Sequence, residues 1–174
     1  ENKKNYRLVL INSKSIKVIA MDYDGTIVKS NDIKDEAFNS ILDDWPLHKN
    51  EMMNWHKKND NIDRKEKFTF FVEKILERKA DQTLINLLVK QFSLLTKKKI
   101  IKCPQVEGVT YFLNYFKNKV PLYLLSATPQ AELNEILTKT NLDKYFSGIY
   151  GAPIDKSNVL TKIIKNEKIK SSET

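Results

Sequence analysis

The sequence predicts an α/β fold, a parallel sheet with covering helices and an inserted block of α-helices. Two observations lead to this prediction. Short apolar runs rich in β-branched residues alternate with amphipathic helical patterns, an order typical of parallel strands joined by helices. In addition, every periodic segment from about 32 to 98 is helical. These residues are therefore expected to form one insertion into the sheet domain.

Two short apolar runs open the chain. Residues 6–11 are strand-like and are followed by a polar turn. Residues 16–21 are rich in β-branched side chains and are followed by Asp22 and, soon after, Gly25, which favours a buried strand over a helix. Asp22 is therefore expected to lie at the C-terminal end of a strand.

The insertion is predicted to contain three firm helices, at 33–45, at 68–76 and after Asp81. Asn31 or Asp32 is the expected cap of the first helix, and Pro46 is its expected stop. Residues 50–63 are polar and poorly periodic, so no helix is assigned to them.

Strands return after Pro104. The expected order is a helix at 109–116, a strand at 120–125 ending at Ser126, a helix reaching Thr140, a strand at 149–150 and a helix at 159–164. Thr128 is the expected cap of the middle helix, with Pro129 in its first turn. This alternation completes the pattern of an open parallel sheet.

Length and composition exclude several classes of protein. The chain has 174 residues and is 41% apolar, which suits one domain with a substantial core. No apolar run approaches the roughly 18 residues needed to cross a bilayer. The single cysteine, Cys103, cannot form an internal disulfide or a cysteine-rich zinc site, which favours a reducing, cytoplasmic location. Because the first residue is Glu1 and nothing resembles a signal peptide, we expect a trimmed chain or a fragment.

The net charge of +8 comes mainly from lysine, since only three of the 30 cationic residues are arginine. The lysines are spread along the chain and form a single triplet at 97–99. Nucleic-acid recognition usually relies on arginine forks and on clustered cations with interleaved aromatic residues. We therefore expect a basic surface. A basic nucleic-acid binder is the alternative, and it would show strongly salt-dependent binding to DNA or RNA.

The most informative stretch is Asp22-Tyr23-Asp24-Gly25-Thr26. It places two carboxylates at the C-terminal end of a predicted strand, where ligand crevices form in open α/β sheets. Carboxylates this close repel each other, so either a cation neutralises them or one keeps its proton, and both arrangements suit catalysis. Mg²⁺ is the natural cation for such oxygen ligands. The alternative is an ordinary Asx turn that closes the strand.

This Asp-x-Asp-Gly-Thr pattern resembles the first motif of the haloacid dehalogenase-like (HAD) superfamily. The resemblance implies a HAD-like Rossmannoid fold and a hydrolase that works through an aspartyl-phosphate intermediate. It implies that Asp22 is the nucleophile and that Asp24 is the general acid and base. It also implies that the Asp22 carboxylate and the Asp24 backbone carbonyl bind Mg²⁺.

Two later segments resemble the second and third motifs of that superfamily. Ser126 follows the predicted strand at 120–125, and its hydroxyl and the amide of Ala127 would donate to a phosphate oxygen. A serine that only caps a helix is the alternative. Lys156 precedes the last helix and would screen the charge between nucleophile and phosphate. A solvated surface lysine is the alternative there.

The fourth motif, acidic residues after one more apolar strand, is absent from the sequence. The chain ends at Thr174, where that strand is expected to begin, so we expect a C-terminally truncated core with an incomplete metal site. Asp143 or Asp155 could substitute, although nothing in their context supports it. This chain is expected to bind Mg²⁺ weakly and to hydrolyse p-nitrophenyl phosphate poorly or not at all, whereas the same chain extended through the next strand should do both.

These motifs divide the chain into an expected HAD-like core at 1–30 and 100–174 and a helical cap at 31–99. The cap resembles that of the phosphoglycolate phosphatase and β-phosphoglucomutase-like branch, and would close over the site and choose the substrate. Its polar stretch offers six candidate substrate contacts: His48, Trp55, His56, Lys57, Lys58 and Arg64. Packing or a surface position is the alternative for each.

The function implied is Mg²⁺-dependent hydrolysis of small phosphorylated metabolites. A phosphomutase or phosphonatase of the same branch would use the same residues. Asp24 argues against a dehalogenase, because that chemistry does not need a second aspartate. A non-catalytic HAD-like binding or regulatory module is the alternative from another class, since the fourth motif is missing. The sequence does not determine the substrate or the oligomeric state.

Overall fold

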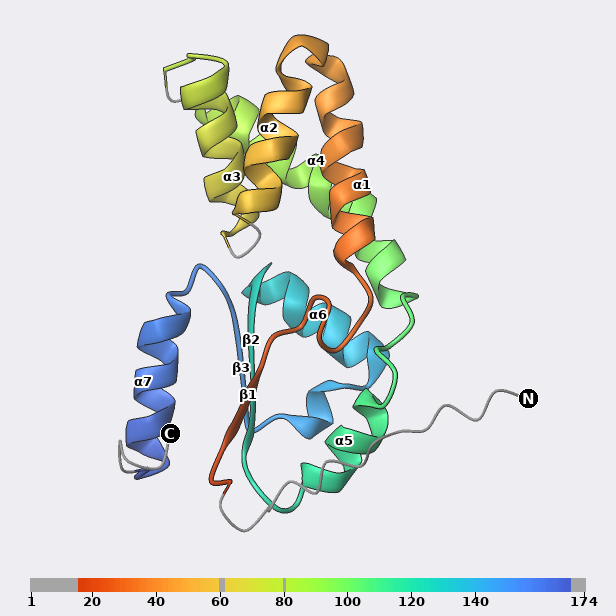
Figure 1. The fold of residues 1–174 in the computed structure, drawn as a ribbon, viewed down its shortest axis with the longest axis vertical. Helices are drawn as coiled ribbons and strands as arrows, with labels where there is room; N and C mark the ends of the chain where they lie inside the picture. The colour runs from red at the N-terminus through yellow and green to blue at the C-terminus, as the bar shows by residue number, and fades with distance from the viewer. Residues whose placement is uncertain (1–15, 60–61, 80, 170–174) are drawn as a thin grey trace, which may run out of the picture.

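A three-stranded parallel sheet forms the centre of the computed structural model, which describes residues 16–59, 62–79 and 81–169 (Figure 1). The strands lie in the order β1 (Ile19–Met21), β2 (Leu122–Pro129) and β3 (Gly148–Ala152). Ile19 pairs with Leu122, and Tyr123 pairs with Gly148. The predicted α/β class with a parallel sheet is confirmed. The strand predicted at 6–11 lies outside the described residues.

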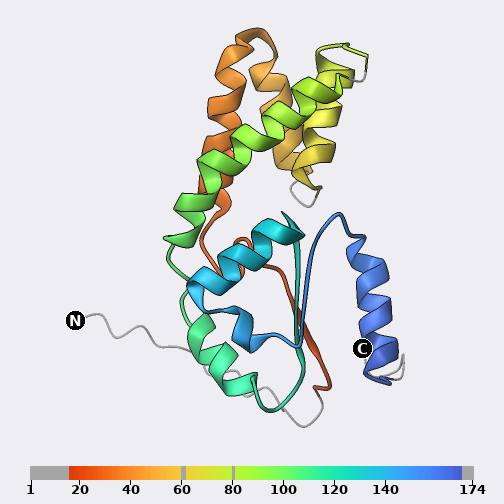
Figure 2. The same cartoon turned by 180° about the vertical axis from the view of Figure 1, so that it is seen from behind.

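Three helices cover the sheet: α5 (Val109–Phe116), α6 (Gln130–Thr140) and α7 (Lys156–Asn166). Figures 1 and 2 show α5 and α6 on one side of the sheet and α7 on the other. Side chains along β2 point alternately to these two sides of the sheet. Leu122 and Leu124 point to the first side and are buried in one cluster with residues of α5 and α6. The Tyr123 hydroxyl instead donates to Glu167, just after α7, and this hydrogen bond raises the pKa of Tyr123 to about 12.

The described residues from 31 to 101, which make up the insertion, form helices and turns without an extended strand, as predicted for this part of the chain. Figures 1 and 2 show these helices gathered at the end of the molecule where β2 finishes. They are α1 (Asn31–Ile41), the 3-10 turn η1 (Leu42–Asp44), α2 (Pro46–Lys58), α3 (Arg64–Phe70), the π-helical turn η2 (Phe71–Ile75) and α4 (Gln82–Ile101). A further 3-10 turn, η3 (Asp143–Tyr145), precedes β3.

Buried apolar side chains form two separate clusters. One lies between the sheet and helices α5 and α6 and contains, for example, Leu124. The other lies inside the helical insertion around Phe38. Helix α4 contributes Phe92 to the insertion cluster and Ile100 to the sheet cluster. Each part therefore has its own core, and α4 connects the two.

Two boundaries in the insertion differ from the sequence predictions. Ser30 occupies the N-cap position of α1, one residue before the predicted cap at Asn31 or Asp32. Pro46 ends the first helical segment as predicted, but it also begins α2, where its missing amide hydrogen costs nothing. Helix α2 covers much of the stretch left unassigned at 50–63. Only Met52 and His56 of this helix are buried, so its apolar pattern is weak.

The junction between β2 and α6 also differs from the prediction. Thr128 was the expected helix cap and Pro129 the first-turn residue, but β2 continues to Pro129 and α6 begins at Gln130. The reason is strand pairing, because Pro129 is opposite Ala152 after an irregularity in the β2–β3 register. Thr128 therefore lies in the strand, and its side chain is available to other partners.

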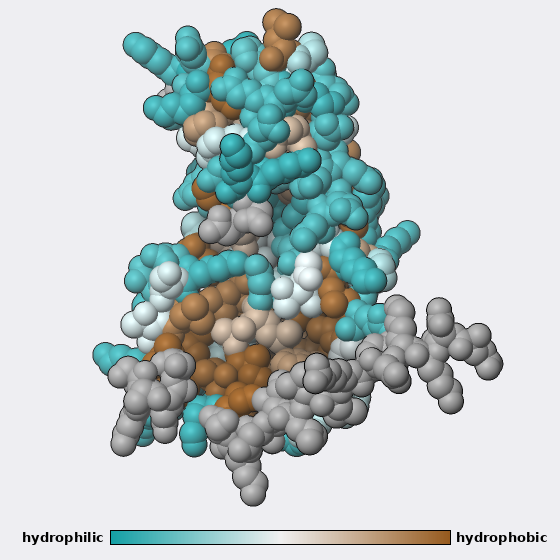
Figure 3. Space-filling model, viewed as in Figure 1, coloured by the Kyte–Doolittle hydropathy of each residue, from teal (hydrophilic) through white to brown (hydrophobic). Residues whose placement is uncertain are grey.

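Polar and apolar residues are distributed unevenly over the surface. The side of the molecule in Figure 3 is hydrophilic over most of the helical insertion, and hydrophobic residues gather over the sheet below. Within the described ranges, no helix combines the length and the apolar character needed to cross a bilayer.

Candidate active site

The loop after β1 turns two aspartates toward one side. Asp22 and Asp24 flank Tyr23, whose side chain is fully buried in the sheet cluster. Gly25 makes the turn possible, because it has a φ of +72° and a Cβ at this position would lie 2.6 Å from Asn31 Nδ2. The sequence pattern thus produces a buried aromatic anchor with a carboxylate on each side.

Tyr23 is a residue that the sequence analysis did not assign. Its hydroxyl is buried without a hydrogen-bond partner among the described residues. Burial, with a smaller contribution from the nearby Asp24 carboxylate, raises the pKa of the Tyr23 hydroxyl well above its usual range. Tyr23 therefore stays neutral and acts as an apolar anchor for the loop.

Asp22 meets the predicted third-motif lysine. Lys156 Nζ donates to Asp22 Oδ2 at 2.9 Å, and the amide of Tyr23 donates to Asp22 Oδ1 at 2.7 Å. The Asp22 side chain is 45% exposed, so it is open to a ligand. Lys156 is the first residue of α7, and Asp155 caps that helix by accepting from the amide of Ser157 at 2.8 Å.

Asp155 and Asp143 are the two acids considered as substitute metal ligands, and both accept hydrogen bonds from other groups. The Asp155 carboxylate accepts from backbone amides of α7 and from the Asn158 side chain. Asp143 lies in η3 and accepts from Thr138 Oγ1 at 3.4 Å and from the amide of Lys144 at 3.0 Å. Neither acid lines the cavity around Asp22.

The Asp24 carboxylate binds Ser30 and Lys34, and Lys34 links it to Thr128 of β2. Its Oδ1 accepts from Ser30 Oγ at 2.6 Å, and its Oδ2 accepts from Lys34 Nζ at 2.5 Å. Lys34 also donates to Thr128 Oγ1 at 3.3 Å. The side chains of Asp24 and Lys34 are 14% and 19% exposed, so this ion pair is largely shielded from water. The contact fixes the orientation of the Asp24 carboxyl.

Lys34 was not predicted as a site residue, although the sequence contains a signal for it. Asn31, Lys34, Asp35 and Phe38 are spaced three or four residues apart along α1, so they share one helix face. All four line the cavity next to Asp24. A polar face directly after the aspartate loop could have identified Lys34 as a site residue.

The second-motif segment lies beside the aspartates. Ala127 lines the cavity, whereas Ser126 is fully buried and its Oγ accepts from the amide of Thr128 at 3.1 Å. Gly151 lets β3 approach this segment, because a Cβ at 151 would lie 2.6 Å from the Cα of Gln130. Asp22, Asp24, Ala127 and Lys156 thus meet at one cavity, which Ser126 does not line.

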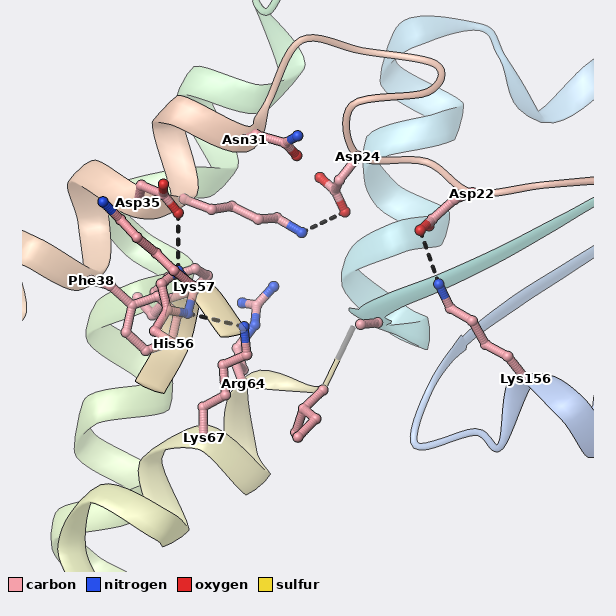
Figure 4. A pocket seen from close by; sticks show the side chains of 14 residues that line it. Asp22, Asp24, Asn31, Asp35, Phe38, His56, Lys57, Arg64, Lys67 and Lys156 are labelled. Carbon is pink, nitrogen blue, oxygen red and sulfur yellow. Dashed lines mark hydrogen bonds and ion pairs between the residues drawn. The ribbon is translucent and has the colours of Figure 1, made fainter. Parts of the chain in front are cut away.

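The cavity has a volume of about 300 Å³ and lies between the strand ends and the helical insertion (Figure 4). Figure 4 shows Asp22 and Asp24 facing it from the sheet domain, and Asp35, His56, Arg64 and Lys67 facing it from the insertion. Its lining residues are Asp22, Asp24, Asn31, Lys34, Asp35, Phe38, His56, Lys57, Ile62, Arg64, Lys67, Phe92, Ala127 and Lys156.

The six candidate cap contacts separate into two groups. His56, Lys57 and Arg64 line the cavity, and the other three do not. Trp55 instead stacks on Phe70 with ring centroids 3.9 Å apart, which is a packing role.

Oxygen donors for a cation are few at this site. The Asp22 carboxylate and the Asp24 backbone carbonyl remain the donors predicted from the motif. In the portion of the chain that the structure describes, no cluster of three or more His, Cys, Asp or Glu side chains is placed to hold a metal ion.

A buried ion pair joins the insertion to the sheet domain. Arg64 Nη1 and Nη2 donate to Glu132 Oε2 and Oε1 at 2.8 and 3.1 Å, and the two side chains are 5% and 10% exposed. Ser93 Oγ completes the contact by donating to Glu132 at 3.0 Å. Arg64 starts α3 and Glu132 lies in α6, so this pair fixes how the insertion sits on the sheet domain.

Replacing Arg64 with methionine is expected to lower the free energy of unfolding by about 3–5 kcal/mol, because Glu132 is left buried without its cation. Urea denaturation measures the change. The double variant Arg64→Met with Glu132→Gln should lose less than the sum of the two single variants. Lys65→Met, an exposed neighbour, is the control and should change stability by no more than about 0.5 kcal/mol. Additive losses in the double variant would contradict the coupling.

Comparison with known families gives a match over nearly the whole chain. The model of one family, the haloacid dehalogenase-like hydrolases, matches residues 16–173. Among curated protein sequences, none matches the chain.

Several solved structures share the fold at low sequence identity. A predicted phosphoglycolate phosphatase from Haemophilus somnus has a TM-score of 0.64 and 19% identity, over 87% of this chain and 72% of that one. A candidate β-phosphoglucomutase from Thermotoga maritima has a TM-score of 0.59 and 19% identity, over 89% and 72%. A HAD-superfamily hydrolase of subfamily IA from Geobacter sulfurreducens has a TM-score of 0.57 and 18% identity, over 91% and 76%. At these identities the similarity shows the fold.

Proposed function

The chain belongs to the haloacid dehalogenase-like hydrolase family, and on that premise we propose that it hydrolyses phosphate monoesters of small metabolites through an aspartyl-phosphate on Asp22. The observation that supports this best is the 2.9 Å contact between Lys156 Nζ and Asp22 Oδ2, because the two residues are 134 positions apart. An ammonium beside the nucleophile reduces its repulsion from an anionic phosphate. We further propose that residues 31–99 act as the cap.

In the first proposed step, an Asp22 carboxylate oxygen bonds to phosphorus and the ester P–O bond breaks. Asp24, in its protonated form, gives its proton to the departing oxygen. The contacts from Ser30 and Lys34 suit the carboxylate that remains after this transfer, and they hold it in one orientation for the second step.

In the second step, a water molecule attacks phosphorus and the bond between phosphorus and Asp22 breaks. The Asp24 carboxylate takes a proton from that water, which restores both aspartates and releases inorganic phosphate. Lys156 and the amide of Ala127 stabilise the charge on the phosphate oxygens in both steps. The hydrogen bond from the Thr128 amide to Ser126 supports this role, because it fixes the backbone around Ala127.

Mg²⁺ is the cofactor that this proposal includes. The Asp22 carboxylate and the Asp24 carbonyl are hard oxygen donors of the kind that Mg²⁺ takes, so the donor chemistry fits. When bound, the cation would offset the negative charge of the phosphate as Asp22 approaches it. With so few protein ligands, water would fill most of the six positions.

We expect this chain to bind Mg²⁺ weakly in isothermal titration, and we expect EDTA to abolish its hydrolysis of p-nitrophenyl phosphate. Asp22→Ala should weaken binding further because it removes the carboxylate donor. Asp32→Asn, an exposed acid on α1, is the control and should leave binding unchanged. Full activity in EDTA would argue against the metal. Tight binding would show that another acid completes the site, and variants of Asp143 and Asp155 would then identify it.

A phosphomutase is the second candidate, because the same contact between Lys156 and Asp22 would serve it. Such an enzyme would transfer the phosphoryl group from Asp22 to a hydroxyl of the substrate in place of water. Product analysis distinguishes the two, since a mutase gives an isomeric sugar phosphate and little inorganic phosphate.

Partners and location follow from the same proposal. The expected partner is a small phosphorylated molecule, with no nucleic acid or membrane involved. Cys103 is a free, half-buried thiol and the single cysteine of the chain, which suits a reducing cytoplasmic location.

A further inference from the structure

Helix α6 has two faces with different partners. Leu133, Ile136 and Leu137 are buried in the cluster that packs on the sheet. Glu132 and Glu135 are three residues apart, so they share another face of the helix, and both bind side chains of the insertion. Helix α6 therefore packs its apolar face on the sheet and holds the insertion with its acidic face.

The contact at Glu132 is shielded from water. Its carboxylate accepts from Arg64 of α3 and from Ser93 of α4, and Arg64 Nη1 also donates to Ser93 Oγ at 2.6 Å. While both charges are present, each compensates the other and the pair can stay buried. If one is removed, the other is left buried without compensation. Opening the contact is then favoured, because it returns the remaining charge to water.

The contact at Glu135 lies nearer the surface. Lys97 Nζ of α4 donates to Glu135 Oε2, and the two side chains are 35% and 37% exposed. Hydrogen bonds from Lys139 of α6 and from Lys97 hold the pKa of Glu135 below its usual range, so this acid is ionised at neutral pH. Because the pair is partly exposed, salt screens it more than it screens the pair at Glu132.

The chain crosses between the insertion and the sheet domain at two places that lie side by side. Val28 is bridged to Gln105, and the amide of Lys29 donates to the carbonyl of Pro104 at 3.0 Å. Ile100, just before the second crossing, packs in the sheet cluster. Helix α4 is therefore anchored to the sheet domain by an apolar contact next to the two crossings.

The charged contacts lie away from the crossings. Ser93 and Lys97 precede Ile100 on α4, and at about 1.5 Å per residue they lie roughly 10 and 5 Å back along the helix. Arg64 belongs to a different helix of the insertion. A rotation of the insertion about the two crossings would therefore keep the apolar contact and separate the charged ones.

We propose that these contacts form a charged latch, Glu132 with Arg64 and Glu135 with Lys97, that keeps the insertion closed over the strand ends. Breaking the latch turns the insertion about the two crossings and opens the cavity to water. The inference rests on the proposed phosphohydrolase function, in which residues 31–99 act as the cap. It assigns the closing contact to α6, a helix that contributes no side chain to the cavity lining.

Distances between two spin labels test the latch. Leu47→Cys on α2, at a position that is 92% exposed, labels the insertion, and Lys162→Cys on α7 labels the sheet domain. Cys103→Ser removes the native thiol. Double electron–electron resonance on this labelled parent chain should give one closed distance, with less than about 1% of the molecules open.

Glu132→Gln keeps the size of the side chain and removes its charge. It should add a second, longer distance and raise the ratio of open to closed molecules by about 100-fold or more, because Arg64 is left buried without its anion. Removing both charges, in Arg64→Met with Glu132→Gln, should return most of the distribution to the closed distance. A merely structural loss would not give this recovery.

Ionic strength tests the outer contact. In Glu132→Gln, raising KCl from about 0.05 M to about 0.5 M should raise the ratio of open to closed molecules further, by roughly two- to fivefold, because salt screens the pair of Lys97 and Glu135. Adding Lys97→Met should remove this dependence. Lys99→Met is the matched control and should change neither result, because Lys99 lies on the same helix but binds Glu36 within the insertion at 3.2 Å.

An unchanged distance distribution in Glu132→Gln would overturn the inference, and so would equal opening in Lys99→Met. If Glu132→Gln does not fold, Glu132→Asp takes its place. That variant keeps the charge but shortens its reach by one methylene group, so it should give a smaller fraction at the longer distance, and a fully closed distribution would again overturn the latch.

Hydrolysis of p-nitrophenyl phosphate by the labelled parent chain separates this inference from the proposed function. Opening in Glu132→Gln, when the parent chain does not hydrolyse, overturns the phosphohydrolase alone. Hydrolysis by the parent chain, when Glu132→Gln stays closed, overturns the latch alone.

Discussion

Replacing Asp22 with asparagine is expected to abolish phosphate ester hydrolysis, because an amide cannot form the acyl phosphate on which the proposed mechanism depends. The substitution is nearly isosteric. The amide oxygen can still accept from the backbone of Tyr23, and the position is 45% exposed, so the fold should not change. Release of inorganic phosphate from a panel of phosphate monoesters measures the loss.

The control for this variant is Asp32→Asn, the same change at an exposed acid outside the cavity, which should keep the parent rate. Mass spectrometry of acid-quenched parent protein should also detect a phosphoryl group on the peptide that contains Asp22. Hydrolysis at the parent rate in Asp22→Asn, or a phosphoryl group on another residue, would show that Asp22 is not the nucleophile.

Asp24→Asn is expected to slow hydrolysis by roughly 10²–10⁴-fold, the usual range for a lost general acid or base. The loss in the phosphorylation step should be larger for an alkyl phosphate than for p-nitrophenyl phosphate, because p-nitrophenolate leaves without a proton. Rapid-quench measurements of the two substrates provide this comparison.

The matched control for Asp24→Asn is Lys34→Met, which removes the same ion pair and leaves the Asp24 carboxyl in place. It should slow hydrolysis less than Asp24→Asn does. Equal losses in the two variants, with no dependence on the leaving group, would mean that the ion pair holds the loop and that Asp24 transfers no proton.

Local sequence patterns predicted the secondary structure best where one strong signal dominated. The stretch at 16–21 and its following glycine predicted β1, and Asp81 predicted the start of α4, whose first-turn amide at Leu84 it caps at 3.0 Å. Helix α2 could not be predicted, because only Met52 and His56 of its residues are buried. This helix is stabilised by packing against the other helices of the insertion, and the sequence of the segment alone does not reveal that packing.

Boundaries depended on contacts that lie outside the local pattern. Thr128 has the side chain of a good helix cap, but pairing of Pro129 with Ala152 keeps it in β2. Its hydroxyl then accepts from Lys34, a residue 94 positions away. Local propensity is a weak influence on the backbone once a strand partner is in place.

The sequence by itself determined the aspartate loop, the order of β1, β2 and β3 along the chain and the membership of the family, because these depend on residues close together in the chain. The tertiary structure decided which of the many lysines reach the site: Lys156 at Asp22, Lys34 at Asp24 and Lys67 at the far end of the cavity. It also decided that Arg64 pairs with Glu132. The physical reason is that each of these contacts joins elements that are separate in the sequence, and only the packing of the folded chain sets the distance between them. A local pattern of charge or hydropathy does not specify the distance between two such elements.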